Sequence, residues 1–326
     1  MLSTASRATT TTTTAATRQP DTVIEPRGPF SWAAALDVFG NFGPIRRHWR
    51  WSTTLRLAFP LDGTFEPVAV AITERDGALE LRIAGTDRID AVARQVARIF
   101  SLDYDGTAYP AVGERDPEIG RLITALPGLR PVCFTSPYET AAWAIVSQRI
   151  SMRQAAVIQD RLIAEHGESI EIEGEMVRAF PHPEQLLRLT QVPGLSAEKV
   201  ERLRGVGRAA LDGRLDIDRL RALGEIDGPE SLRAIRGIGP FWSSGIYLRG
   251  CGIADAFPAE PLSIAALGIT HGLGENPSAA DVERLSEVFR PFRMWVCFLL
   301  RVAANRELVP GIRGREMAIR RSAPMG

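Results

Sequence analysis

Lysine is almost absent from this sequence of 326 residues. Lys199 is the only lysine among 39 basic residues, and the other 38 are arginine. A reaction that needs a lysine to form a Schiff base with its substrate therefore has one candidate in the chain. Thirty-nine acidic residues balance the basic ones to a net charge of zero. Because the chain has no overall positive field, an anionic partner must be held by a local site.

Cysteine and histidine are also scarce. Cys133, Cys251 and Cys297 are the three cysteines, and they lie far apart. This spacing excludes a disulfide framework, a CxxC redox pair and a four-cysteine cluster, and it favours the reducing cytoplasm. The four histidines show no metal-ligand spacing. No stretch approaches roughly 18 uninterrupted apolar residues, so we expect no segment to cross a membrane.

The N-terminal part of the chain changes character twice. Residues 1–29 contain the threonine run from Thr9 to Thr14 and are predicted to form a disordered tail. Between Trp49 and Ala84, apolar residues alternate at every second position, with Asp-Gly pairs between the runs, which predicts an antiparallel meander. A helical pattern of apolar residues then continues to Ile99. We therefore expect a small α+β domain over residues 30–129.

After Pro131 the pattern is helical, so residues 130–310 are predicted to be a helical region, followed by a loose basic tail over residues 311–326. Helices are expected to begin at Ser136-Pro137 and at Ser151, and Ser196 is expected to cap a third helix. The other expected helices cover residues 183–189, 229–235, 241–248, 262–267, 279–289 and 292–304. The helix after Ser196 has a local excess of basic residues, which either follows a phosphate backbone or is a solvated face. The fold class that we predict is α+β.

The most informative segment runs from Leu232 to Leu248, where one helix ends at Gly237-Ile238-Gly239 and a second helix begins. Two glycines two positions apart allow a tight turn and leave amide groups uncovered. These amides add to the free N–H groups and the positive dipole of the next helix, a combination that binds a phosphate oxygen. The alternative is an ordinary helix stop followed by a new start.

Three blocks of the chain resemble the helix-hairpin-helix DNA glycosylases, especially the 3-methyladenine DNA glycosylase II type, over about residues 130–305. Residues 142–151 resemble the family's helix and turn that end in a glutamine and a wedge residue. Residues 235–242 resemble its phosphate-gripping hairpin, and residues 255–262 resemble the loop with its catalytic carboxylate. The run Pro291-Phe292-Arg293 is similar to a later family motif.

This resemblance implies an enzyme that kinks DNA, flips a damaged nucleotide into an aromatic pocket and stabilises the sugar cation with a carboxylate as the base leaves. The implied catalytic residue is Glu260, with Asp255 in reserve. The other implied site residues are the DNA-backbone contacts Gly237, Ile238 and Gly239, the base-pocket aromatics Phe241, Trp242 and Trp143, and the wedge residues Arg149 and Gln148.

The chain departs from the family pattern at two positions. Where Glu260 stands the family has an aspartate, and a shift of one residue in the loop would place Pro261 there. Asp255 has the alternative role of a loop cap. In the bifunctional relatives a lysine occupies the position of Phe241, so its replacement here implies a monofunctional glycosylase without lyase activity. The family's closely spaced iron–sulfur cysteines are missing, and its hairpin often binds a monovalent cation through backbone carbonyls.

We therefore expect a monomeric hydrolase of base excision repair that removes alkylated purines from double-stranded DNA. It is expected to need no cofactor, to have no membrane partner and to act in the bacterial cytoplasm at the nucleoid. One alternative is a catalytically impaired helix-hairpin-helix protein that recognises damaged DNA without releasing a base. A second alternative is a helical scaffold without affinity for DNA.

Overall fold

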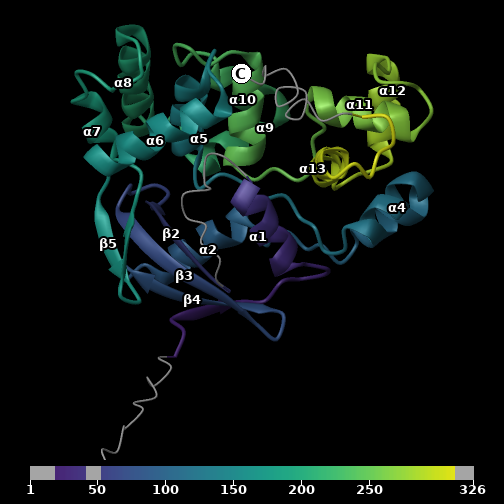
Figure 1. Ribbon diagram of the computed structural model, residues 1–326, viewed down its shortest axis with the longest axis horizontal. Coiled ribbons are helices and arrows are strands. Elements are labelled where there is room, and N and C mark those ends of the chain that lie inside the picture. The colour runs from purple at the N-terminus through teal and green to yellow at the C-terminus, as the bar shows by residue number, and fades with distance from the viewer. Residues whose placement is uncertain (1–18, 42–52, 313–326) are drawn as a thin grey trace, which may run out of the picture.

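The structure is a computed structural model and describes residues 19–41 and 53–312. The predictions for residues 1–18, for the start of the meander at Trp49 and Trp51, and for the basic tail from residue 313 lie outside the described residues. Within the described part, the expected α+β class is confirmed (Figure 1).

A four-stranded antiparallel sheet has the strand order β1-β4-β3-β2. Its strands are β1 (Thr22–Ile24), β2 (Thr54–Pro60), β3 (Pro67–Arg75) and β4 (Ala78–Ala84). The last three form the predicted meander, with each strand paired to the next. The tail prediction is wrong for β1, which pairs with Leu79–Leu81 of β4. A strand of three residues is too short to show an alternating pattern.

The two faces of this sheet are covered by different parts of the chain. Helices α1 (Trp32–Asn41) and α2 (Ile89–Ile99) cover one face, where Leu57 and Phe59 are buried. The other face presents small side chains, including Ala58 and Ala69, to a hairpin of β5 (Ser169–Ile172) and β6 (Glu175–Arg178). Adjacent residues of β2 thus face opposite layers. The β5–β6 hairpin corrects the expectation of a purely helical region after residue 130.

The remaining elements are helices. They are α3 (Pro110–Arg115), α4 (Pro117–Ala125), α5 (Pro137–Ser147), α6 (Met152–His166), α7 (Pro183–Leu187), α8 (Ala197–Leu211), α9 (Ile217–Leu232), α10 (Pro240–Gly245), the π-helical turn η2 (Ile246–Gly250), α11 (Pro261–Thr270), α12 (Ala279–Glu287) and α13 (Arg293–Asn305). The predicted helix starts at Ser136 and Ser151 and the predicted cap at Ser196 are confirmed. The side chain of each serine accepts a hydrogen bond from a backbone amide three residues on. Helix α9 begins earlier than predicted and bends at Gly224, whose φ is 79°.

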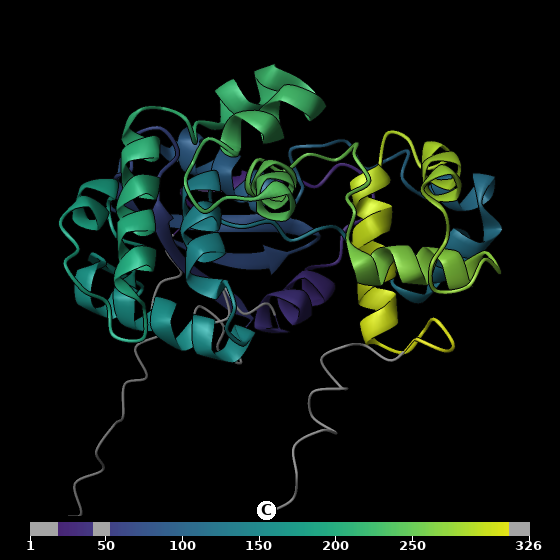
Figure 2. The same ribbon diagram turned by 90° about the horizontal axis from the view of Figure 1, so that it is seen from above.

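Two hydrophobic clusters organise these helices. The first surrounds α5, whose residues are all buried, and includes side chains of α6, α8 and η2. The second joins α3 and α4 to α11 and α13 through side chains such as Val112, Ile119 and Leu299. Figure 1 shows α4 beside α11, α12 and α13, and the view from above in Figure 2 shows this group to one side of the sheet. Residues 110–125, grouped with the N-terminal domain in the sequence analysis, therefore pack against the C-terminal helices.

A buried arginine links the N-terminal sheet domain to the helices around α5. The guanidinium of Arg98 on α2 donates to the carbonyls of Thr135 and Gly250, at 2.5 and 2.6 Å, and pairs with Asp62 at 2.8 Å. Its side chain is only 4% exposed. In the described residues, no helix is long and apolar enough to cross a bilayer.

Candidate active site

The hairpin between α9 and α10 is the glycine turn that the sequence predicts. Gly237 has a φ of 94°, a left-handed conformation that favours glycine. A side chain here would also collide with the core, because a Cβ would lie 2.8 Å from Arg202 Cδ and 2.9 Å from Ile145 Cδ1. Gly239 is exposed and caps the N-terminus of α10. The turn therefore needs glycine at Gly237 for conformation and space together.

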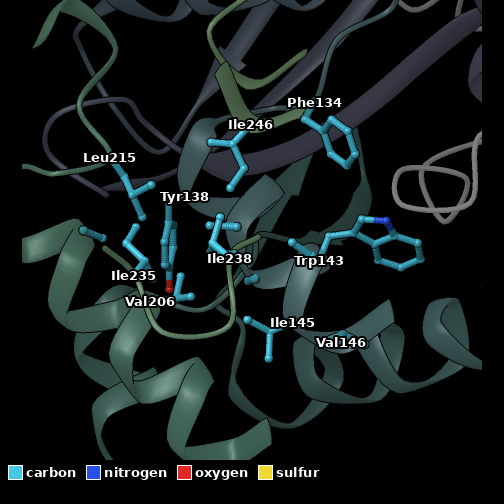
Figure 3. Close-up of a cluster of buried hydrophobic side chains, with 14 of the residues drawn as sticks. Phe134, Tyr138, Trp143, Ile145, Val146, Val206, Leu215, Ile235, Ile238 and Ile246 are labelled. Atoms are coloured by element: carbon cyan, nitrogen blue, oxygen red, sulfur yellow. The ribbon is translucent and has the colours of Figure 1, made fainter. Parts of the chain in front are cut away.

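Ile238, between the two glycines, anchors the hairpin. Its side chain is buried and packs in the cluster that also contains Ile145, Tyr138 and Ile246 (Figure 3). Its amide donates to the Ile235 carbonyl at 3.0 Å, so this amide is used inside the turn. Within the described residues, no hydrogen bond is donated by the amides of Gly237 or Gly239. Of the three predicted backbone contacts, the two glycines are thus the ones with uncommitted donors.

One of the two predicted wedge residues, Gln148, contacts this hairpin directly. Gln148 ends α5, and its Nε2 donates to the Gly237 carbonyl at 2.7 Å. Arg149 follows with an exposed side chain and a φ of 57°. A left-handed arginine is uncommon, and such outliers occur where the surroundings hold the backbone in place. The structure therefore joins Gln148 to the glycine turn, and Arg149, which follows Gln148 in the chain, is exposed next to it. These two residues are called the wedge tip below.

The three aromatic candidates differ in exposure. Phe241, in the first turn of α10, is 60% exposed, and its ring meets the half-buried Trp242 edge-on at 5.4 Å. Trp143 is 1% exposed. The prediction that Trp143 lines a base pocket is wrong for this structure, because α5 is enclosed on all sides by other elements. Phe241 is the candidate that is open to a base.

Glu260 lies at the N-terminus of α11, where one of its oxygens caps the helix. Oε2 accepts a hydrogen bond from the Ser263 amide at 2.6 Å and lies 2.6 Å from Ser263 Oγ. Oε1 accepts from Arg301 on α13 at 3.4 Å. The carboxylate thus interacts with a helix N-terminus through one oxygen and with a guanidinium through the other. Pro261 is the first residue of α11, a favoured position for proline.

A second arginine lies near this carboxylate. Burial lowers the pKa of the Arg249 guanidinium, in the turn η2 that follows α10, to about 10, and the charge of Glu260 opposes this effect. Arg249 also lies over the Phe134 and Phe298 rings, at 5.7 and 5.3 Å from their centroids.

Asp255, the reserve carboxylate, is fully engaged by two arginines. Oδ2 pairs with Arg290 at 2.6 Å and Oδ1 with Arg293 at 2.7 Å. Arg293 donates to the Asp255 carbonyl as well, at 2.8 Å. These contacts agree with the alternative role predicted for Asp255, which is that of a loop cap.

Three contacts were not foreseen in the sequence. Arg301 is 41 residues from Glu260, and nothing in the local sequence links them. Lys199 and Arg202 belong to the basic excess of α8, but both donate to Gln148, at 2.6 and 2.9 Å. Their spacing of three residues on a helix was a signal that they share a face.

A glycine turn between two helices, bound by the glutamine that ends α5 and followed by an exposed aromatic residue in α10, is a helix-hairpin-helix motif. A 3-methyladenine DNA glycosylase structure from Archaeoglobus fulgidus has the same fold, with a TM-score of 0.72 and 24% identity over 86% of this chain and 97% of that chain.

Sequence comparison points the same way. The chain is 24% identical over 216 residues, 65% of this chain, to the DNA-3-methyladenine glycosylase of Bacillus subtilis, and covers 71% of it. It is 29% identical over 219 residues, 64% of this chain, to a probable bifunctional transcriptional activator/DNA repair enzyme AlkA of Mycobacterium tuberculosis, and covers 42% of that protein. No family model matches the chain. The chain is therefore similar in sequence to 3-methyladenine DNA glycosylases and shares its fold with a helix-hairpin-helix glycosylase structure.

Proposed function

We propose that this protein is a DNA glycosylase that removes alkylated purines from duplex DNA by hydrolysing the N-glycosidic bond. The observation that carries the proposal is the contact between the glycine turn and the wedge tip, with Phe241 exposed three residues after Ile238. These parts supply a grip on the DNA backbone, a group to enter the base stack and a surface for a flipped base. The similarity to glycosylases of alkylated adenine supports the choice of substrate.

In this proposal, the amides of Gly237 and Gly239 hold one phosphate of the DNA. Arg149 enters the stack, where a planar guanidinium can lie on a base face and also meet a phosphate. Phe241 stacks on the flipped base. The contacts are local, which suits a chain without net positive charge.

Glu260 is the proposed catalytic carboxylate. Oε2 stays on the N-terminus of α11, and Oε1 faces the sugar, where positive charge develops as the C1′–N bond breaks. The bond electrons leave with the base, and a water molecule gives its hydroxide to C1′ and its proton to solvent. An alkylated purine already carries a positive charge, so its departure needs no protonation by the protein.

Replacement of Glu260 by glutamine tests this assignment. Glu260→Gln keeps an oxygen that can cap α11 and removes the charge, so release of methylated bases should fall by more than about 100-fold while DNA affinity stays near the wild-type value. Asp255→Asn is the matched control in the same loop. It should lower the thermal midpoint through its lost arginine pairs and leave the rate of release per folded molecule within a few-fold.

A second candidate function is recognition of damaged DNA without base release. The engagement of both Glu260 oxygens, together with the glutamate in place of the family's aspartate, favours it. The same assay separates the two functions, because a binding protein would retard methylated duplex in a gel and leave every base attached in wild type and Glu260→Gln alike.

We also propose that the enzyme lacks lyase activity. The only lysine is Lys199, and its Nζ donates to two backbone carbonyls of the α5 terminus. Borohydride should therefore trap no covalent complex with abasic DNA, and a trapped complex would contradict this part of the proposal. The monomeric state, the cation at the hairpin carbonyls and the location at the nucleoid stay predictions.

A further inference from the structure

Lys199, the one lysine of the chain, lies where α5 ends and the wedge tip begins. Its Nζ donates to the carbonyls of Val146 and Gln148, at 2.8 and 2.6 Å. The last carbonyls of a helix have no partner within the helix and carry partial negative charge. The Lys199 ammonium group has several N–H donors. It can therefore bind a carbonyl at the end of α5 and the carbonyl of Gln148, the first residue of the wedge tip, at the same time.

Arg202, one turn further along α8, binds the side chain of the same glutamine. Its Nη1 donates to Gln148 Oε1 at 2.9 Å, while Gln148 Nε2 donates to the Gly237 carbonyl at 2.7 Å. Arg202 Cδ also fills the space beside Gly237. The Gln148 amide thus spans from α8 to the hairpin, and both of its polar atoms are used.

The charges of this arrangement are balanced from nearby. Glu198, on the same helix, accepts from Arg202 at 2.6 Å and lies 3.9 Å from Arg236 of the hairpin. Burial, followed by the neighbouring Arg202 guanidinium, lowers the pKa of Lys199. Two cations on adjacent turns repel each other. The polar oxygens of Gln148 offset this repulsion, so the cations and the tip stabilise one another.

We propose that Lys199 is a positioning residue for the wedge. By fixing the Gln148 carbonyl, it holds Arg149 in its left-handed conformation at a set distance from the glycine turn, so that the hairpin and the wedge meet DNA as one rigid unit. The inference rests on the proposed function, since a wedge has meaning only for a protein that opens the base stack. Lys199 itself touches no DNA in this account.

The test compares Lys199→Met with a matched control on the same helix. Methionine preserves length and apolar bulk and removes the donors. Arg208→Met is the control, because Arg208 is 56% exposed and pairs only with Glu201 in the described residues. The probe is a duplex with a tetrahydrofuran abasic analogue beside 2-aminopurine, whose fluorescence rises when the stack is opened. Binding to undamaged duplex is measured in parallel over a range of salt concentrations.

Lys199→Met should slow the fluorescence rise of the bound complex by about tenfold, the effect of losing charge-assisted hydrogen bonds at a half-buried site. Its affinity for undamaged duplex should stay within about twofold, with the same salt slope, and amide hydrogen exchange over residues 147–150 should be faster without DNA. Lys199→Arg should recover part of the rate. Arg208→Met should match the wild type in every readout.

Four results would overturn the inference. The first is a Lys199→Met protein that opens the stack at the wild-type rate but whose DNA affinity depends less on salt. If the slope of log affinity against log salt concentration were smaller by about 0.9, Lys199 would be a phosphate contact instead. A Lys199→Met protein equal to wild type in opening and in exchange would leave the tip independent of it. Should Lys199→Met fail to fold, Gln148→Met, which cuts the link to Gly237, must show the same slowed opening. A wild-type protein that neither opens the stack nor releases bases would remove the proposed function and this role together.

Discussion

Phe241 is the residue at which a role in DNA binding can be separated most clearly from a role in protein stability. Its side chain is 60% exposed, so truncation removes little packing. Stacking of a base on an aromatic ring is worth about 1–3 kcal/mol, so Phe241→Ala should weaken binding to duplex with an abasic or flipped site by roughly 5- to 150-fold.

The matched control for Phe241→Ala is Ile226→Ala, because Ile226 on α9 is an apolar side chain with 83% exposure. It should change neither binding nor the melting temperature. Fluorescence anisotropy and thermal melts of both variants provide the measurement. Equal DNA affinities for the two variants would show that Phe241 contributes no stacking.

Single residues also show what could be read from the sequence. The turn at Gly237 and the helix cap at Ser196 were predicted correctly, because both depend on backbone conformation and on neighbours within a few residues. Trp143 was not, because its burial depends on helices that surround α5 from distant parts of the chain. The Arg301 contact to Glu260 depends on how α11 and α13 pack, which no local pattern encodes.

At the scale of elements, alternation and caps predicted β2 to β4 and most helices within a few residues. The β5–β6 hairpin was missed, although its turn, Glu173-Gly174, is a usual turn signal. Its strands have four residues each and are largely exposed, so the alternation of Ile170 and Ile172 is too short to stand out as a strand. Ion pairs of Glu173 with Arg56 and Arg82 hold the hairpin on the sheet.

The junction between α2 and the helices around α5 depends on Arg98. Arg98→Met would leave the carbonyls of Thr135 and Gly250 without their donor and the half-buried Asp62 without its cation. Loss of one partner from a buried charged network costs about 3–5 kcal/mol. Urea denaturation should show this loss as a lower midpoint.

Arg94→Met is the control for this junction, since Arg94 is on the same helix and exposed. It should unfold at the wild-type midpoint. If Arg98→Met and Arg94→Met were equally stable, the buried contacts of Arg98 would add nothing to the junction.

At the scale of the whole molecule, the position of a helix in the sequence does not decide which hydrophobic cluster it packs in. Helices α3 and α4 precede residue 130 but complete the cluster of α11 and α13, where Tyr109 packs on Phe292 and Trp295 with ring centroids 5.4 and 5.1 Å apart. The sequence places these helices in an N-terminal domain because contact across so many residues leaves no periodic signal. The helical region after residue 130, which carries the candidate site, therefore depends on packing contacts with residues that precede it.

A polypeptide of residues 130–312 should consequently fail to fold cooperatively. It lacks Val112, Ile119 and Leu122 from the second cluster, and it lacks Arg98. Circular dichroism should show helical signal without a sharp thermal transition, whereas residues 19–312 should melt cooperatively. A sharp transition of the shorter polypeptide would show that the helical region is an independent domain.

The most direct test of the whole account is chromatography of what the wild-type protein releases from methylated duplex DNA. The account predicts free methylated purines in amounts that rise with protein and time, from strands that stay intact until alkali is added. Binding that depends on salt, with no free base above the spontaneous background, would contradict catalysis and leave a hairpin protein that only recognises DNA.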